Sequence, residues 1–158
     1  ELGIRNQEFG TRNPEPKNRS DGAGMRDEER SYGQCSFGFE DLDIYKAARD
    51  FRMRMYRVAK LLPAEERYAL TQQMRRAAIS LTNNLAEGYG RYTWQDRTHF
   101  CRQVRGSLME LVDDIDICRQ EVYISEEEAA RLRDQAVRVL QLMNGYIGYL
   151  QKGLKKKE

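Results

Sequence analysis

Apolar residues recur at alternating spacings of three and four positions along four long stretches of this chain. That spacing follows the turn of an α-helix, so each stretch carries one apolar stripe along one side of a helix. The clearest stripe lies in the last stretch and consists of Ala129, Leu132, Ala136, Val139, Met143, Tyr146 and Leu150. We expect helices over about 41–62, 64–87, 94–122 and 125–157, and no strands. Short connections between such helices favour an all-α, antiparallel up-and-down four-helix bundle.

The ends of the expected helices carry residues that start and stop helices. Pro63 ends the first helix, because proline disfavours helical geometry in the residue before it. Gly88 marks the end of the second helix. Thr93, followed by Asp96, offers a cap for the third helix, and Ser125, followed by three glutamates, opens the fourth. These signals divide the predicted bundle at three short turns.

The first 38 residues differ from the rest of the chain. They are rich in glycine, hold two of the three prolines and contain few apolar side chains, so they cannot bury enough apolar area to become ordered. We expect 1–38 to be a disordered N-terminal extension and 39–158 to be the bundle. Residues 1–24, which precede Met25, are expected to lie outside the native product or the fold. The alternative is a functional basic arm, which the near-balance of charges in this segment disfavours.

Composition excludes several classes of protein. No run approaches the roughly 18 consecutive apolar residues of a membrane span, and no signal segment opens the chain, so we expect neither a membrane protein nor a secreted one. Cys101 and Cys118 would lie about 25 Å apart along one helix, which is too far for a disulfide. Reduced thiols are typical of a reducing compartment, so we expect a cytoplasmic location.

Candidate catalytic groups are also missing from the sequence. His99 is the sole histidine, so a di-iron bundle or a structural zinc site cannot be assembled from the usual ligands. Glu110 and Asp114 could form a pair of carboxylates on one helix, but no base, nucleophile or metal ligand accompanies them. We therefore expect no enzyme activity, no metal and no cofactor.

Basic residues gather on one side of the first predicted helix. At about 100° per residue, four of them fall within a narrow sector opposite the apolar stripe; they are Lys46, Arg49, Arg57 and Lys60. Such a surface could follow a phosphate backbone and bind it in a salt-dependent way. The other interpretation is a solvated surface, because Asp43 and Asp50 are spaced to pair with Lys46 and Arg54.

The second predicted helix carries a polar side and a mixed side besides its apolar stripe. The residues concerned are Tyr68, Arg75, Arg76, Ile79, Asn83, Asn84, Glu87 and Glu110, the last from the third helix. One interpretation is a structural network between helices or subunits, for example Arg76 with Glu87 or Glu110, which would fix their register. The other is a ligand site formed by the arginines with Asn84 and Glu87.

A second basic group lies near the start of the third predicted helix. Arg91, Arg97, Arg102 and Arg105 occur there together with the aromatic residues Tyr92 and Trp94 and with His99. Aromatic and basic side chains together can stack on bases and neutralise phosphates. Trp94 could equally be a hydrophobic staple at the helix start. Both interpretations stay open at the level of the sequence.

Several segments resemble a known family in order along the chain. The segment LTQQMRRAAISLTNNLAEGYGR (70–91) is similar to the signature of the 23S rRNA intervening-sequence proteins, and FEDLDIYKAARD (39–50), LPAEERYAL (62–70), GSLMELVDDI (106–115) and YISEEEAARL (123–132) match as well. Thr82 departs from the family pattern, which often has proline there, so we expect a straighter second helix. The resemblance implies a bacterial four-helix bundle without established catalytic activity.

The resemblance also suggests partners. A related branch, the accessory variability proteins of diversity-generating retroelements, assembles as a pentamer and binds nucleic acid with a reverse transcriptase, so we expect a homo-oligomer that binds RNA or a ribonucleoprotein. The alternative is a structural adapter for a protein partner such as a reverse transcriptase encoded by the same element. A net charge of +2 permits RNA binding without requiring it.

Overall fold

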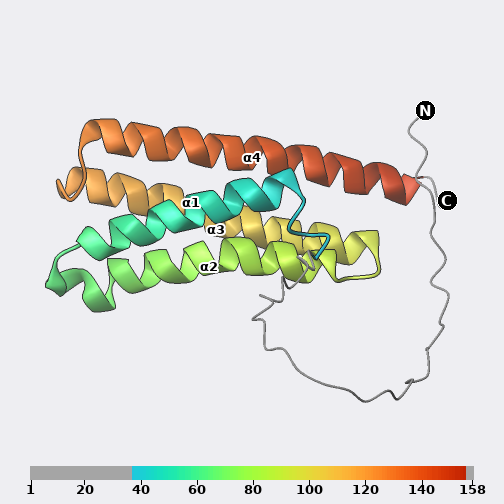
Figure 1. Ribbon diagram of the computed structural model, residues 1–158, viewed down its shortest axis with the longest axis horizontal. Helices are drawn as coiled ribbons and strands as arrows, with labels where there is room; N and C mark the ends of the chain where they lie inside the picture. The colour runs from blue at the N-terminus through green and yellow to red at the C-terminus, as the bar shows by residue number, and fades with distance from the viewer. Residues whose placement is uncertain (1–36, 156–158) are drawn as a thin grey trace, which may run out of the picture. The chain divides into compact units, whose positions relative to one another are not determined.

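The computed structural model describes residues 37–155, which form four α-helices and one short 3-10 helix (Figure 1). The helices are α1 (Asp43–Leu61), η1 (Ala64–Tyr68), α2 (Leu70–Tyr89), α3 (Trp94–Gln120) and α4 (Glu126–Lys155). No strand occurs among these described residues. The predicted all-α class is confirmed. The predicted disordered segment 1–38 lies outside the described residues, except for Phe37 and Gly38.

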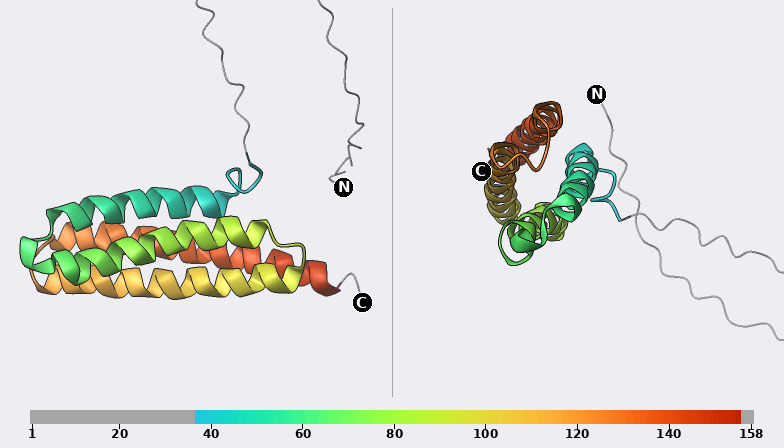
Figure 2. Two further views of the ribbon diagram at one scale, coloured as in Figure 1. Left: turned by 90° about the horizontal axis from the view of Figure 1, so that it is seen from below. Right: turned by 90° about the vertical axis from the view of Figure 1, so that its left-hand side faces the viewer.

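The four helices pack as an up-and-down bundle. Helices α1 and α3 each contact both α2 and α4, so neighbouring helices run antiparallel around one core (Figure 2). The predicted apolar stripes meet in this core, whose largest fully buried side chains include Phe51, Met55, Met74, Leu81, Leu108, Leu111, Ile115, Leu132, Met143 and Leu150. Each such side chain contributes about 1.5–3 kcal/mol by leaving water. The stripes therefore determine which sides of the helices remain outside.

The helix ends agree with most of the predicted signals. The Asp96 backbone N–H donates to Thr93 Oγ1 at 3.1 Å, and the Glu128 N–H donates to Ser125 Oγ at 3.2 Å, so both predicted caps are present. The start of the second helix was placed six residues too early. Residues 64–68 form the 3-10 helix η1, and Ala69 has a non-helical backbone (φ −111°, ψ −104°) before α2 begins.

The described part of the chain has neither a membrane-spanning helix nor a cross-link. No helix in residues 37–155 is both long enough and apolar enough to cross a bilayer. Cys101 and Cys118 are unbonded and buried in the core, and burial raises the pKa of each thiol to about 11. Both thiols are therefore protonated at neutral pH and act as small apolar core residues.

Candidate nucleic-acid interface

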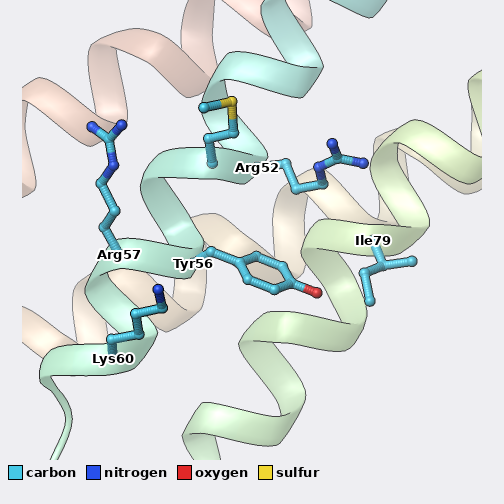
Figure 3. A pocket seen from close by; sticks show the side chains of 6 residues that line it. Arg52, Tyr56, Arg57, Lys60 and Ile79 are labelled. Carbon is cyan, nitrogen blue, oxygen red and sulfur yellow. The ribbon is translucent and has the colours of Figure 1, made fainter.

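A pocket of about 400 Å³ lies on the outer surface between α1 and α2 (Figure 3). Its lining consists of Arg52, Met53, Tyr56, Arg57, Lys60 and Ile79. Three of these side chains are cations, and none of the described residues that line the pocket is acidic. The ring of Tyr56 extends from α1 toward α2, where Ile79 lies. The pocket therefore combines an apolar and aromatic surface with positive charge.

Two contacts hold the pocket side chains in place. Arg52 Nη1 donates a hydrogen bond of 2.8 Å to Thr82 Oγ1 on α2, and that hydroxyl in turn donates to the Ile79 carbonyl at 3.3 Å. The Arg75 guanidinium lies over the Tyr56 ring, 5.8 Å from its centroid. Both contacts join α1 to α2, so they fix one arginine and the aromatic ring before any ligand arrives.

Helix α2 is continuous through Thr82. Thr82 is buried, with 1% of its surface exposed, and it keeps its place in the helix while its hydroxyl accepts the bond from Arg52. A proline at this position would supply no hydroxyl. The threonine is therefore responsible for orienting Arg52, a role that the sequence did not indicate.

The four predicted basic residues of α1 are all exposed, but they are not equivalent. Arg57 and Lys60 line the pocket, whereas Lys46 and Arg49 lie nearer the start of α1. Arg49 Nε lies 3.5 Å from Asp50 Oδ1. That pair is exposed on both sides and contributes little to stability. It stands in place of the predicted pairing of Asp50 with Arg54.

The opposite flank of α2 carries a hydrogen-bonded network with α3. Asn84 Nδ2 donates to Ser80 Oγ at 2.8 Å and to the Ser80 carbonyl at 2.9 Å, and Ser107 Oγ on α3 donates to the same Ser80 hydroxyl at 2.8 Å. Asn84, one of the predicted network residues, thus acts within a single chain. This network lies between two packed helices and satisfies polar groups there.

A buried carboxylate lies farther along the same α2–α3 contact. Asp114 is fully buried, and Gln73 Nε2 on α2 donates to its Oδ1 at 2.9 Å, while its Oδ2 has no hydrogen-bond partner. Burial raises its pKa to about 6; the Gln73 bond opposes this, and the nearby charges of Asp113 and Glu110 add to it. Glu110, the other member of the possible carboxylate pair, is exposed, whereas the Asp114 side chain faces α2, so the two carboxylates lie in different environments.

The remaining predicted residues of the second helix are dispersed over the surface. Glu87 pairs with Arg91, one turn further along, and not with Arg76. Arg76, Asn83 and Glu110 are exposed, as is Tyr68 in η1. Ile79 and Arg75 belong to the α1–α2 side described above. The residues of the predicted polar and mixed sides are therefore divided among an α1 flank, an α3 flank and an exposed ridge.

At the far end of the bundle, two of the predicted RNA-binding arginines are engaged within the chain. The Arg97 guanidinium lies over the rings of Tyr89 and Trp94, at 5.6 and 5.4 Å, and its Nε donates to the Arg91 carbonyl at 2.8 Å. The Arg91 guanidinium lies 4.9 Å from the centroid of the Phe100 ring. These contacts brace the α2–α3 loop. Arg102 and Arg105 are exposed on α3 instead.

Trp94 is packed rather than presented to solvent. Its ring meets Tyr149 of α4 edge to face, with 5.9 Å between centroids. A Cβ added at Gly153 would lie 2.9 Å from Trp94 Cε2, so α4 approaches the indole as closely as a glycine allows. Tyr92, two residues earlier, is fully exposed. The structural interpretation of Trp94 is therefore the better one.

The groove between α3 and α4 has a different character. It has a volume of about 180 Å³ and is lined by Met109, Val112, Arg133, Ala136, Val137 and Leu140. Its lining is mostly apolar with a single cation.

In residues 37–155, no group of three or more histidine, cysteine or acidic side chains could hold a metal ion.

The fold and the site together define a class: an all-helical bundle with a cationic pocket on one outer surface. A family model described as 23S rRNA-intervening sequence protein matches residues 40–145, and the chain belongs to that family. No curated protein matches the chain.

One solved structure supports the fold. It is the crystal structure of a protein with unknown function from the S23 ribosomal protein family of Bacteroides thetaiotaomicron, with a TM-score of 0.61 and 16% sequence identity. The similarity covers 66% of this chain and 95% of that chain. At this identity the comparison supports the bundle alone. The relation to retroelement accessory proteins stays a prediction.

Proposed function

We propose that this protein is a non-enzymatic, oligomeric, cytoplasmic protein that binds RNA through the α1–α2 surface. The observation that carries the proposal is the pocket lined by Arg52, Arg57 and Lys60 with no acidic partner among the described lining residues. Each phosphate that such cations neutralise releases counterions and adds to affinity. Membership of the rRNA intervening-sequence family gives RNA as the first ligand to test.

The arrangement of charge supports a phosphate ligand more than a solvated surface. Charges on a solvated helix usually alternate in sign and pair with one another. Here the α1–α2 side adds Arg75 to the three pocket cations, and its arginine contacts go to a hydroxyl and an aromatic ring. Neither contact neutralises a guanidinium. An oligomer would multiply this charge and concentrate it on one surface.

The test is binding of the full chain to a fluorescent hairpin RNA, followed by anisotropy at increasing salt. We expect affinity to fall linearly with the logarithm of salt concentration, with a slope that corresponds to several phosphate contacts. Light scattering behind size exclusion on the same sample gives the oligomeric state. The absence of binding at low salt would overturn the proposal, and a monomeric mass would overturn its oligomeric part.

A second candidate is an adapter for a protein partner, such as a reverse transcriptase encoded by the same genetic element. The observation that favours it is the apolar α3–α4 groove, where Met109 is 44% exposed and Val137 is 51% exposed. Apolar residues that form a contiguous exposed patch often mark a protein contact site. An oligomer that ignores RNA but binds the enzyme would favour this candidate.

A further inference from the structure

The α1–α2 pocket has the size of a small-ligand site and not of a shallow phosphate contact. Its volume of about 400 Å³ falls within the range of roughly 300–1,000 Å³ that small-molecule sites occupy. A phosphate bound by surface cations needs no such hollow. The volume of the pocket therefore leaves room for a ligand group besides the phosphate.

The interior of the pocket supplies surfaces that suit a flat, partly apolar group. Met53 and Ile79 present aliphatic atoms, and Tyr56 presents an aromatic ring between the two helices (Figure 3). The planar guanidinium of Arg52, held by Thr82, can also stack on a ring. Nucleobases bind on aromatic and guanidinium surfaces of this kind.

The cations of the pocket are exposed where they would meet a phosphate. Arg57 and Lys60 are exposed on α1, whereas Arg52 is half-buried and tied to α2. The described lining thus contains both parts that a nucleotide needs: stacking surface and positive charge. It contains no carboxylate that would repel a phosphate.

From this geometry we infer that the pocket takes one unpaired nucleotide of the bound RNA. The base lies against Met53, Tyr56 and Ile79, and its phosphate contacts Arg57 and Lys60. Bases inside a duplex are stacked and must be extruded at a free-energy cost, whereas a bulged or looped base is already available. The inference rests on the proposed RNA binding and adds a preference for unpaired nucleotides.

The experiment compares two fluorescent RNA hairpins with the same stem, one fully paired and one with a single bulged adenosine. The full chain should bind the bulged hairpin about tenfold more tightly, as expected for one stacked base. The substitution Met53→Trp fills the pocket without changing its charge. It should abolish the preference for the bulged hairpin, because the base can no longer enter.

Met109→Trp is the matched control. Met109 is 44% exposed in the α3–α4 groove and Met53 is 47% exposed in the pocket, so both indoles replace similarly exposed methionines. The control should keep the tenfold preference. Circular dichroism on both variants checks that the bundle is intact, and Ile79→Trp provides a second way to fill the pocket from α2.

The outcomes separate the two proposals. Equal binding of both hairpins by the unsubstituted chain would overturn the nucleotide pocket while leaving RNA binding in place. A preference that survives in both folded pocket variants would also overturn it. Failure to bind either hairpin at low salt would overturn the proposed function itself, and the pocket with it.

Discussion

The two flanks of helix α2 carry polar residues in similar number but use them differently. Toward α3, Ser80 and Gln73 form hydrogen bonds with side chains of the neighbouring helix. Toward α1, Arg75 lies over an aromatic ring, and Thr82 accepts from an arginine whose charge remains unneutralised. The α3 flank is closed and largely satisfied, whereas the α1 flank opens into a cationic pocket.

The difference shows what distinguishes structural from ligand-binding polar groups on one helix. A polar group between packed helices must find a partner within the protein, because its desolvation is otherwise uncompensated. A cation beside an open pocket keeps its water and its charge, and both can be exchanged for a phosphate. Substitutions on the α1 flank should therefore change binding, and those on the α3 flank should change stability.

Reversing charge in the pocket should have the largest effect. In the double variant Arg57→Glu, Lys60→Glu, we expect hairpin RNA affinity at low salt to fall about a hundredfold, equivalent to about 3 kcal/mol. Both side chains are exposed, so helicity and melting temperature should change little. Anisotropy measures the affinity, and thermal melting followed by circular dichroism measures stability. Unchanged RNA affinity in the folded variant would contradict the assignment of RNA binding to the α1 flank.

The variant Asp114→Asn tests the α3 flank of α2 through the pH dependence of the free energy of unfolding. Because burial raises the Asp114 pKa from 3.8 to about 6, the native protein holds this proton more tightly than the unfolded chain. The contribution of Asp114 to the free energy of unfolding is therefore unimpaired below pH 3.8 and decreases as pH rises through 6. Relative to the unsubstituted chain, the variant should gain about 3 kcal/mol in free energy of unfolding between these limits.

Denaturant unfolding at a series of pH values measures this difference. Asparagine retains a carbonyl oxygen for the Gln73 bond, so the variant removes the ionisable group while keeping that contact. Asp134→Asn is the control, because Asp134 is exposed on α4 and is not among the charges that act on the Asp114 pKa. A pH-independent difference between Asp114→Asn and the unsubstituted chain would mean that the carboxyl is not desolvated.

The two flanks of α2 also show how much of the structure could be predicted from the sequence. Apolar spacing predicted the four helices and their buried sides because that periodicity reflects burial directly. It also grouped Arg76, Asn83 and Glu87 on the polar and mixed sides of the second helix. Spacing within one helix cannot say which neighbour each residue meets, and the assignment of α2 flanks depends on where α1 and α3 pack.

Partners across helices were the least predictable part of the site. The Arg52–Thr82 bond joins residues 30 positions apart, and the Gln73–Asp114 bond joins residues 41 apart. Neither leaves a local signal. Arg97 was predicted to bind RNA because it lies among aromatic residues, yet those same rings hold it within the protein. The exposure of Arg57 and Lys60 could be predicted because it follows from their place opposite the apolar stripe, whereas their role in RNA binding stays a prediction.

Ser80→Ala should reduce stability without affecting RNA binding. Ser80 Oγ accepts from both Asn84 and Ser107, so its removal takes away two hydrogen bonds. Each donor has another acceptor within reach, since Asn84 also bonds the Ser80 carbonyl, and the single Ser107 hydroxyl proton can turn to the Gln103 carbonyl at 3.2 Å. We therefore expect a loss of only about 1 kcal/mol by denaturant unfolding. A change in RNA affinity would contradict the separation of the two flanks.

The double variant Arg102→Glu, Arg105→Glu should have the smallest effect of these variants, a slight loss of RNA affinity. This pair lies on α3, away from the pocket lining, and its reversal changes the net charge by as much as the pocket variant does. If only total charge mattered, both double variants would bind RNA equally poorly. Because we assign the contacts to the α1–α2 surface, we expect less than about a threefold loss of affinity at moderate salt, where distant charges are screened. Anisotropy titrations of the two variants, measured side by side, therefore distinguish a local site from the overall field of the protein. An equal loss in both would show that position on the bundle is irrelevant.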